Sequence, residues 1–172
     1  MVSLYLIFYG CLELRFPDVE TNPGPRRPVP EACRILCSNV RGLSKNLSDV
    51  TVDSSLYDLL LCYETLVMDR HHMSELLVPG FGHPVLLCRD GVPQARGLAA
   101  YVRDGYEEFR QPKFECSCCE MLVFRVCGAR HNFYVFSLYR YPDLDDRIYD
   151  FLLTAMAAVQ ATDACASFLF CG

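Results

Sequence analysis

From residue 33 onward, short apolar runs bounded by polar residues alternate with segments of helical periodicity. Residues 34–40 and 57–63 each contain such a run and predict a buried strand. Residues 43–56, which lie between them, predict a helix because their apolar residues recur at helical spacing. A strand, a helix and a second strand in this order predict an α/β fold with a mixed sheet.

The remainder of the chain continues this pattern. The further elements that we expect are a short helix at 69–77, strands at 85–88, 97–103, 121–127 and 132–139, a helix at 143–161 and a strand at 167–171. A short turn separates the strands at 121–127 and 132–139, which predicts a hairpin. Asp143 is a suitable N-cap for the last helix, whose apolar residues fall on one face. Together these elements predict an α/β sandwich.

The composition limits the class of protein. With 172 residues, 52% of them hydrophobic, the chain can build the core of one domain, which excludes a disordered protein. Its 10 Gly and 10 Pro show no period, which excludes a fibre. The net charge of -5 argues against a protein that holds nucleic acid by bulk positive charge alone. An enzyme that meets phosphate through a bound metal ion remains open.

The 11 cysteines are odd in number and scattered, and most lie within apolar runs. This usage favours buried thiols in a reducing compartment over a disulfide framework. We therefore expect an intracellular protein, in the nucleus or the cytoplasm. Cys116, Cys118, Cys119 and Cys127 form the one candidate metal cluster. Because no second Cys or His pair lies nearby to complete a zinc site, strand cysteines are the preferred interpretation.

Composition also divides the chain ahead of the domain. Residues 1–16 form an apolar leader that is too short to span a bilayer, so no membrane partner is expected. A signal sequence is the alternative for this leader, although it lacks a basic start and a cleavage motif. Residues 17–32 form a proline-rich linker that cannot be a helix or a central strand. We expect the leader to stand apart from the domain at 33–172 and to be dispensable for its folding.

The linker contains the run Asp-Val-Glu-Thr-Asn-Pro-Gly-Pro at 18–25, which resembles the 2A-type ribosome-skipping peptide. In that family the bond between the last Gly and Pro is not formed while the ribosome continues. Proline is a constrained acceptor amine, and Asn-Pro-Gly favours a tight turn beside it. The resemblance implies two products that separate at this bond; the alternative is a proline-rich linker with an accidental match. The matching residues are Asp18, Glu20, Asn22, Pro23, Gly24 and Pro25.

Six segments after the linker follow the order of motifs in the endonuclease/exonuclease/phosphatase superfamily. They read LCSNVRG (36–42), DLLLCYET (58–65), RGLAAYV (96–102), EMLVFRV (120–126), SLYRYP (137–142) and SFLFCG (167–172). The third segment has Leu98 in place of the second Gly of the family motif. Together the segments resemble the apurinic-type endonuclease domain of non-LTR retrotransposons, whose polyproteins carry 2A-type peptides ahead of that domain. The resemblance implies a four-layer α/β sandwich.

The resemblance also implies a Mg²⁺-dependent site for phosphodiester hydrolysis, in which Mn²⁺ can replace Mg²⁺. A hard cation neutralises phosphate oxygens and the charge on the leaving group, and it prefers oxygen ligands. Glu64 matches the family's metal ligand, Asn39 would add an amide oxygen near the metal or phosphate, and Tyr139 would place its phenol against the phosphate. The alternatives are a solvent-facing residue for Glu64, a cap of the Arg41-Gly42 turn for Asn39 and a core-rim aromatic for Tyr139.

The 172 residues do not contain every motif of that family. The Gly-Asp-x-Asn motif, whose Asp activates the attacking water, begins at Gly172, and the later Ser-Asp-His motif is absent. We therefore expect a truncated sandwich, the N-terminal part of the domain, with little or no activity by itself. Groups of this kind contribute orders of magnitude in rate.

The protein expected from these features is part of a retrotransposon polyprotein that carries a Mg²⁺-dependent DNA endonuclease domain. Its expected partners are target-site duplex DNA and the rest of the polyprotein. The first alternative is another phosphatase or phosphodiesterase of the superfamily, and the second is a non-enzymatic binding remnant. Several arginines are candidates for contacts with DNA phosphates, and the sequence does not choose among them: Arg103, Arg110, Arg125, Arg130 and Arg140.

Overall fold

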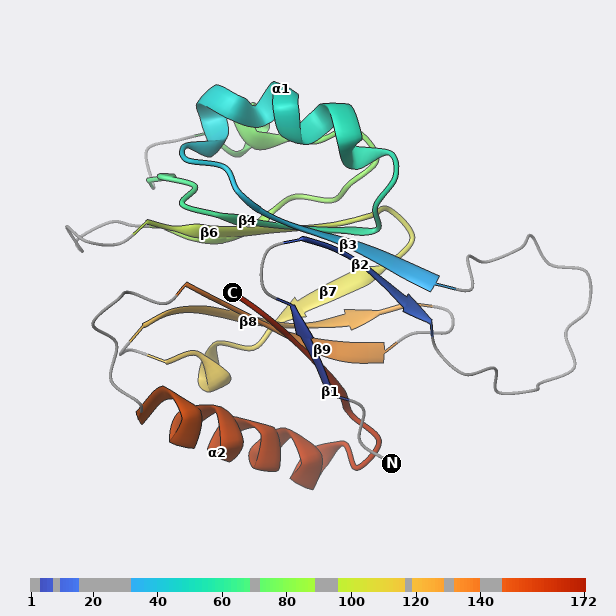
Figure 1. Cartoon of the computed structure of the whole chain (residues 1–172), viewed down its shortest axis with the longest axis vertical. Helices are drawn as coiled ribbons and strands as arrows, with labels where there is room; N and C mark the ends of the chain where they lie inside the picture. The colour runs from blue at the N-terminus through green and yellow to red at the C-terminus, as the bar shows by residue number, and fades with distance from the viewer. Residues whose placement is uncertain are drawn as a thin grey trace, which may run out of the picture.

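A computed structural model describes residues 4–7, 10–15, 32–68, 72–88, 96–116, 119–128, 132–139 and 147–172. Two five-stranded sheets pack face to face, as Figure 1 shows. Helix α1 (Leu43–Ser54) covers the outer face of one sheet, and helix α2 (Arg147–Thr162) covers the outer face of the other (Figure 1). The layers therefore run helix, sheet, sheet, helix, and the α/β class expected from the sequence is confirmed.

The first sheet has the strand order β2-β3-β4-β6-β5. Its strands are β2 (Gly10–Arg15), β3 (Ala32–Asn39), β4 (Leu59–Tyr63), β6 (Leu98–Val102) and β5 (Val85–Leu87). β3 and β4 are parallel and are connected through α1, and Asn39 pairs with Tyr63 in their register. Both strands therefore end at the same edge of the sheet.

The second sheet has the strand order β1-β10-β9-β8-β7. Its strands are β1 (Leu4–Ile7), β10 (Ser167–Cys171), β9 (Asn132–Tyr139), β8 (Glu120–Cys127) and β7 (Glu107–Arg110). β8 and β9 form the expected antiparallel hairpin, and β9 and β10 are parallel with α2 between them in the chain. The carboxyl ends of β9 and β10 therefore also lie at one edge.

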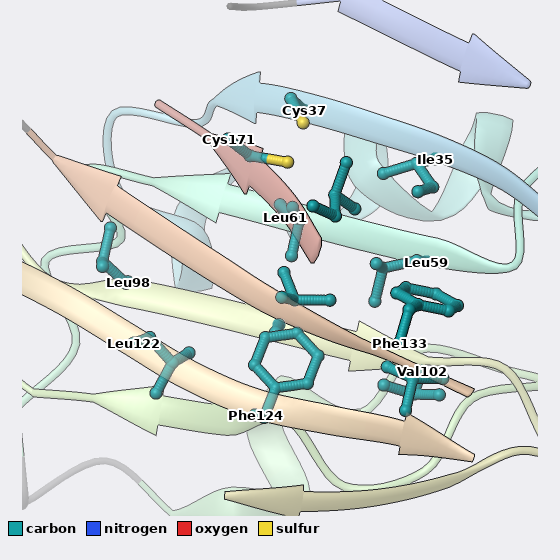
Figure 2. Close-up of a cluster of buried hydrophobic side chains, with 14 of the residues drawn as sticks. Ile35, Cys37, Leu59, Leu61, Leu98, Val102, Leu122, Phe124, Phe133 and Cys171 are labelled. Atoms are coloured by element: carbon teal, nitrogen blue, oxygen red, sulfur yellow. The ribbon is translucent and has the colours of Figure 1, made fainter. Parts of the chain in front are cut away.

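Apolar side chains of both sheets form the central core. All five residues of β4 are buried. Leu59, Leu61 and Tyr63 face the second sheet and pack near residues such as Phe124 and Phe133 (Figure 2). Leu60 and Cys62 point to the opposite face, toward α1, because successive side chains of a strand alternate between its two faces. This double burial explains why β4 reads as a continuous apolar run rather than an alternating one.

The leader does not stand apart from the domain, which corrects the expectation from the sequence. β1 pairs in parallel with β10, and β2 pairs antiparallel with β3. The leader thus supplies an outer strand to each sheet (Figure 1). An apolar run interrupted by a glycine, which was interpreted as one short leader, is in fact divided into two strands.

Three smaller differences separate the expected elements from the observed ones. β7 was not predicted, because its residues are mostly exposed and show no apolar alternation. The short helix expected at 69–77 is a 3-10 helix, η1 (Met73–Leu76), and a second 3-10 helix, η2 (Pro112–Phe114), lies before β8. α1 ends at Ser54 instead of residue 56. At this helix end the guanidinium of Arg103 donates a 2.7 Å hydrogen bond to the Ser54 carbonyl. Such a donor satisfies a carbonyl that the end of a helix leaves unpaired.

The cysteines follow the expected pattern with one exception. Described free thiols that are buried in strands include Cys33, Cys37, Cys62 and Cys171. Burial raises the pKa of the Cys62 thiol to about 12, so it is an inert core residue. Cys116, in contrast, is disulfide-bonded. Within the described parts of the chain, no helix is long and apolar enough to cross a membrane.

Candidate functional site

Three polar side chains meet where β3, β4 and β9 end. Asn39 is the last residue of β3, Glu64 follows β4 directly, and Tyr139 is the last residue of β9. The phenol Oη of Tyr139 donates a 2.8 Å hydrogen bond to Oε1 of Glu64. The side chain of Asn39 also hydrogen-bonds the Glu64 carboxylate. The structure thus brings together the three residues that the sequence selected, and their catalytic and metal-binding roles remain predictions.

The orientation of Asn39 differs from the expected one. Its Oδ1 accepts the backbone N–H of Arg41 at 3.2 Å, so the side chain caps the turn that follows β3. The hydrogen bond to Glu64 is therefore donated by the Nδ2–H₂ group of Asn39, because an ionised carboxylate only accepts. The capping role that the sequence left open is therefore present.

The turns around Glu64 have unusual backbone conformations. Among the non-glycine residues that the structure describes, only Arg41, Glu64 and Leu66 have positive φ, at 47°, 53° and 54°. Backbone strain of this kind persists only where surrounding contacts impose it, and it gathers at functional sites. All three residues lie in the two turns that follow β3 and β4, and backbone hydrogen bonds join these turns to each other.

Backbone hydrogen bonds hold the Glu64 turn on both sides. On one side, Gly42 N–H donates to Glu64 C=O and Leu43 N–H donates to Thr65 C=O, both at 2.8 Å. On the other side, Thr65 and Leu66 donate to the carbonyls of Gly97 and Arg96, at 3.1 and 2.8 Å. These bonds fix the direction in which the Glu64 side chain leaves the turn.

Gly97 has to be a glycine for this arrangement. Its φ is +79°, and a Cβ there would lie 2.6 Å from Oγ1 of Thr65 and 3.2 Å from the carbonyl oxygen of Leu87. Both conformation and space therefore require that no side chain be present. The close approach of residue 97 to the Thr65 backbone depends on this glycine.

The surroundings stabilise the charged form of Glu64. The hydrogen bond from Asn39 is the main cause that lowers the pKa of the Glu64 carboxyl, and the bond from Tyr139 adds to it. Partial burial opposes these bonds, while the positive charges of Arg96 and Arg41 reinforce them. Glu64 is therefore an anion at neutral pH, with two exposed guanidinium groups in its vicinity.

Two buried contacts between the sheets lie in the interior behind the site. Oγ of Ser137 donates to Oη of Tyr63 at 3.2 Å and links β9 to β4. The Cys37 and Cys171 thiols point toward each other across the two sheets (Figure 2). This contact is the main cause that raises the pKa of the Cys171 thiol, and burial is the second cause. The strand ends that carry Asn39, Glu64 and Tyr139 are thus joined through the interior of the sandwich.

Three of the five candidate arginines make contacts within the domain. Arg103 pairs with Asp58 and lies over the Phe81 ring, and Arg110 binds Glu115. Arg125 lies 3.8 Å from Asp163 and stacks on Tyr134. All three therefore hold the fold together.

Two arginines that were not among the candidates from the sequence, Arg41 and Arg96, carry charges that act on Glu64. The signal that could have found them is their position, since each lies in a turn beside a candidate strand end. Arg130 and Arg140 lie outside the described residues, as do Cys118 and residues 18–25, which resemble the ribosome-skipping peptide.

The oxygen ligands at Glu64 fit a hard cation that takes only one or two of its ligands from the protein. The described side chains contain no group of three or more His, Cys, Asp or Glu that could hold a metal ion. Mg²⁺, however, is commonly held by one or two carboxylates together with water and phosphate. A carboxylate has about four lone-pair sites, and the contacts with Asn39 and Tyr139 do not use all of them.

In comparisons with known proteins, no family model and no curated protein matches this chain.

Proposed function

We propose that this chain carries the metal-binding part of a Mg²⁺-dependent phosphodiesterase site and belongs to a DNA endonuclease domain of a retrotransposon polyprotein. The observation that supports it most is the hydrogen bond between Tyr139 and Glu64, which joins two sheets at their strand ends. The order helix, sheet, sheet, helix agrees with the four-layer sandwich of the endonuclease/exonuclease/phosphatase superfamily.

Each side chain has a defined part in this proposal. Glu64 is the anionic ligand for Mg²⁺ or Mn²⁺, and Asn39 and Tyr139 keep its carboxylate ionised and oriented. A bound Mg²⁺ supplies charge neutralisation for the phosphate and the leaving oxygen. Arg41 and Arg96 provide positive potential beside the carboxylate, which suits the approach of a phosphate group. A chain with a net charge of -5 needs such a local concentration of positive charge to meet DNA.

Metal binding tests the proposal directly. We expect the 172-residue chain to bind Mn²⁺ at one site, measured by electron paramagnetic resonance, with Mg²⁺ as competitor. Glu64→Gln removes the anionic ligand at nearly unchanged shape and should weaken binding by at least about tenfold. Glu107→Gln, on the exposed edge strand β7, is the matched control and should bind as the unchanged chain does. Equal Mn²⁺ affinity in the Glu64→Gln variant would refute the metal site.

Substrate class needs a second measurement. With Mg²⁺ present, a short DNA duplex should shift the backbone amide signals of Arg41 and Arg96 in NMR spectra, and an inositol phosphate should not. The reverse result would support a phosphatase of the same superfamily and overturn the assignment to DNA.

A further inference from the structure

Glu120 is a buried carboxylate whose two oxygens both accept backbone N–H groups. It is the first residue of β8 and only 7% exposed. Its Oε2 accepts the N–H of Gly97 at 2.7 Å, and its Oε1 accepts the N–H of Arg96. A carboxylate of the second sheet therefore holds a loop of the first sheet by two neighbouring amides.

The same loop holds the turn that carries Glu64. Gly97 C=O and Arg96 C=O accept the amides of Thr65 and Leu66, which follow Glu64 in the chain. A continuous set of hydrogen bonds therefore runs from the Glu120 carboxylate through two peptide units to the turn with positive φ at Glu64 and Leu66.

Glu120 is also adjacent to the other partner of the Glu64 bond. In the register of β8 and β9, Glu120 lies directly opposite Tyr139. Residues that face each other across antiparallel strands project to the same side of the sheet. Glu120 thus shares a sheet position with Tyr139 and a hydrogen-bonded loop with Glu64.

The chemistry of this contact is specific to a carboxylate. Two oxygens on one planar group can each accept a backbone N–H, and bonds to an ionised acceptor in a buried place are strong. A glutamine of the same shape offers one acceptor and turns its N–H₂ toward the second backbone N–H. An apolar side chain at this position would leave the N–H groups of Arg96 and Gly97 without these two acceptors.

We propose that Glu120 is a positioning residue, which holds the Arg96–Gly97 backbone and thereby sets the direction of the Glu64 carboxylate toward Tyr139. This inference deepens the proposed function and rests on it for its relevance to metal binding. The positioning itself concerns the metal-free chain and can be tested without any metal.

The experiment compares Glu120→Gln with the matched control Glu115→Gln in the full chain. Glu115 is also a carboxylate beside β8 that accepts a backbone N–H, from Val123 at 3.3 Å, and it binds Arg110. Hydrogen exchange of individual amides is read by NMR, urea unfolding measures global stability, and Mn²⁺ binding is measured as above. Glu120→Asp is a second variant, which keeps the charge but shortens the reach by one methylene.

We expect Glu120→Gln to accelerate exchange of the Thr65 and Leu66 amides on the order of tenfold or more relative to slow amides of α2. Mn²⁺ affinity should fall with it, and Glu120→Asp should show a smaller loss of both. Glu115→Gln should leave the exchange of these two amides unchanged relative to α2. If Glu120→Gln does not fold, Glu120→Asp decides the matter by the same two amides.

Two outcomes overturn the inference. The first is exchange that increases by the same factor at Thr65, Leu66 and α2, since that is a global loss of stability without local positioning. The second is an equal Mn²⁺ affinity in the unchanged chain and in the Glu120→Gln variant. If the unchanged chain binds no Mn²⁺, the proposed function fails, whereas selective exchange at Thr65 and Leu66 still supports the positioning.

Discussion

Glu64 and Tyr139 are separated by 75 residues and lie on different sheets, yet a 2.8 Å hydrogen bond joins the phenol of Tyr139 to the Glu64 carboxylate. The bond ties the carboxyl end of β4 to that of β9. Because it favours the ionised carboxylate, the acidity of Glu64 reports on how the two sheet ends are placed.

The acidity of Glu64 should respond to its two donors in a fixed order. Asn39→Ala should raise the pKa of Glu64 more than Tyr139→Phe does, because the Asn39 bond is the larger cause of the lowered pKa. Both variants should move it toward the ordinary value of about 4.3. Carboxyl ¹³C signals followed by NMR against pH give the measurement, with Tyr134→Phe on the same strand as control.

The lowered pKa of Glu64 also predicts a dependence of stability on pH. A carboxyl that is more acidic in the folded chain contributes stability above its unfolded pKa, and this contribution is lost as pH falls through the folded pKa. The unchanged chain should therefore lose more stability than Tyr139→Phe when urea unfolding is repeated from pH 6 down to about pH 3. Parallel losses in the two proteins would contradict the role of the hydrogen bond.

Gly97 should be the most sensitive glycine of the site. Gly97→Ala forces a Cβ to within 2.6 Å of Oγ1 of Thr65 at a φ of +79°, and we expect unfolding by urea to show a loss of about 3 kcal/mol. Gly105→Ala is the matched control, because Gly105 has a φ of +98° but no atom within 4 Å of the added Cβ. It should lose only about 1 kcal/mol, the cost of conformation alone. Equal losses would show that space at Gly97 is not limiting.

The leader should contribute to folding, contrary to the expectation from sequence. A chain that begins at Pro25 lacks β1 and β2 and leaves β10 and β3 as sheet edges. We expect its free energy of unfolding to fall by on the order of a few kcal/mol, with faster amide exchange in β3 and β10 than in β8. Identical stability and exchange in the two chains would show that the pairing is not needed.

Ribosome skipping at the Gly24-Pro25 bond remains a prediction, motivated by the complete motif at 18–25. Translation in vitro with a reporter fused ahead of the chain should give two products, and Pro25→Ala should give one full-length product. Pro28→Ala, a proline of the same linker outside the motif, is the control and should still give two. A single band from the unchanged sequence would show that the match is accidental.

The local elements were largely predictable from the sequence, because burial on both faces left clear apolar runs. β4 and the hairpin of β8 and β9 are such cases. β7 could not be found, since an exposed edge strand carries no apolar period. β1 and β2 were misread because their partners, β10 and β3, lie elsewhere in the chain, and strand pairing at that separation leaves no local pattern.

The candidate site was predictable to a similar depth. Residues at strand ends, such as Glu64 and Tyr139, could be named from the order of motifs. The contributions of Arg96 and Glu120 could not, because they depend on the left-handed turn at Glu64 and on backbone contacts between loops. Asn39 could also be named from its strand end, but which end of its amide faces Glu64 was decided by the turn at Arg41.

The leader strands acquire a different meaning when they are considered with the Gly24-Pro25 bond. While the linker is intact, β1 and β2 belong to the same molecule as the strands with which they pair, and a covalent connection of this kind gives an effective concentration of about millimolar. If that bond is never made, the same strands become a separate peptide whose occupancy depends on its abundance in the cell. The edges of β10 and β3 would then be binding sites that a second leader peptide or another extended segment could occupy by adding a strand.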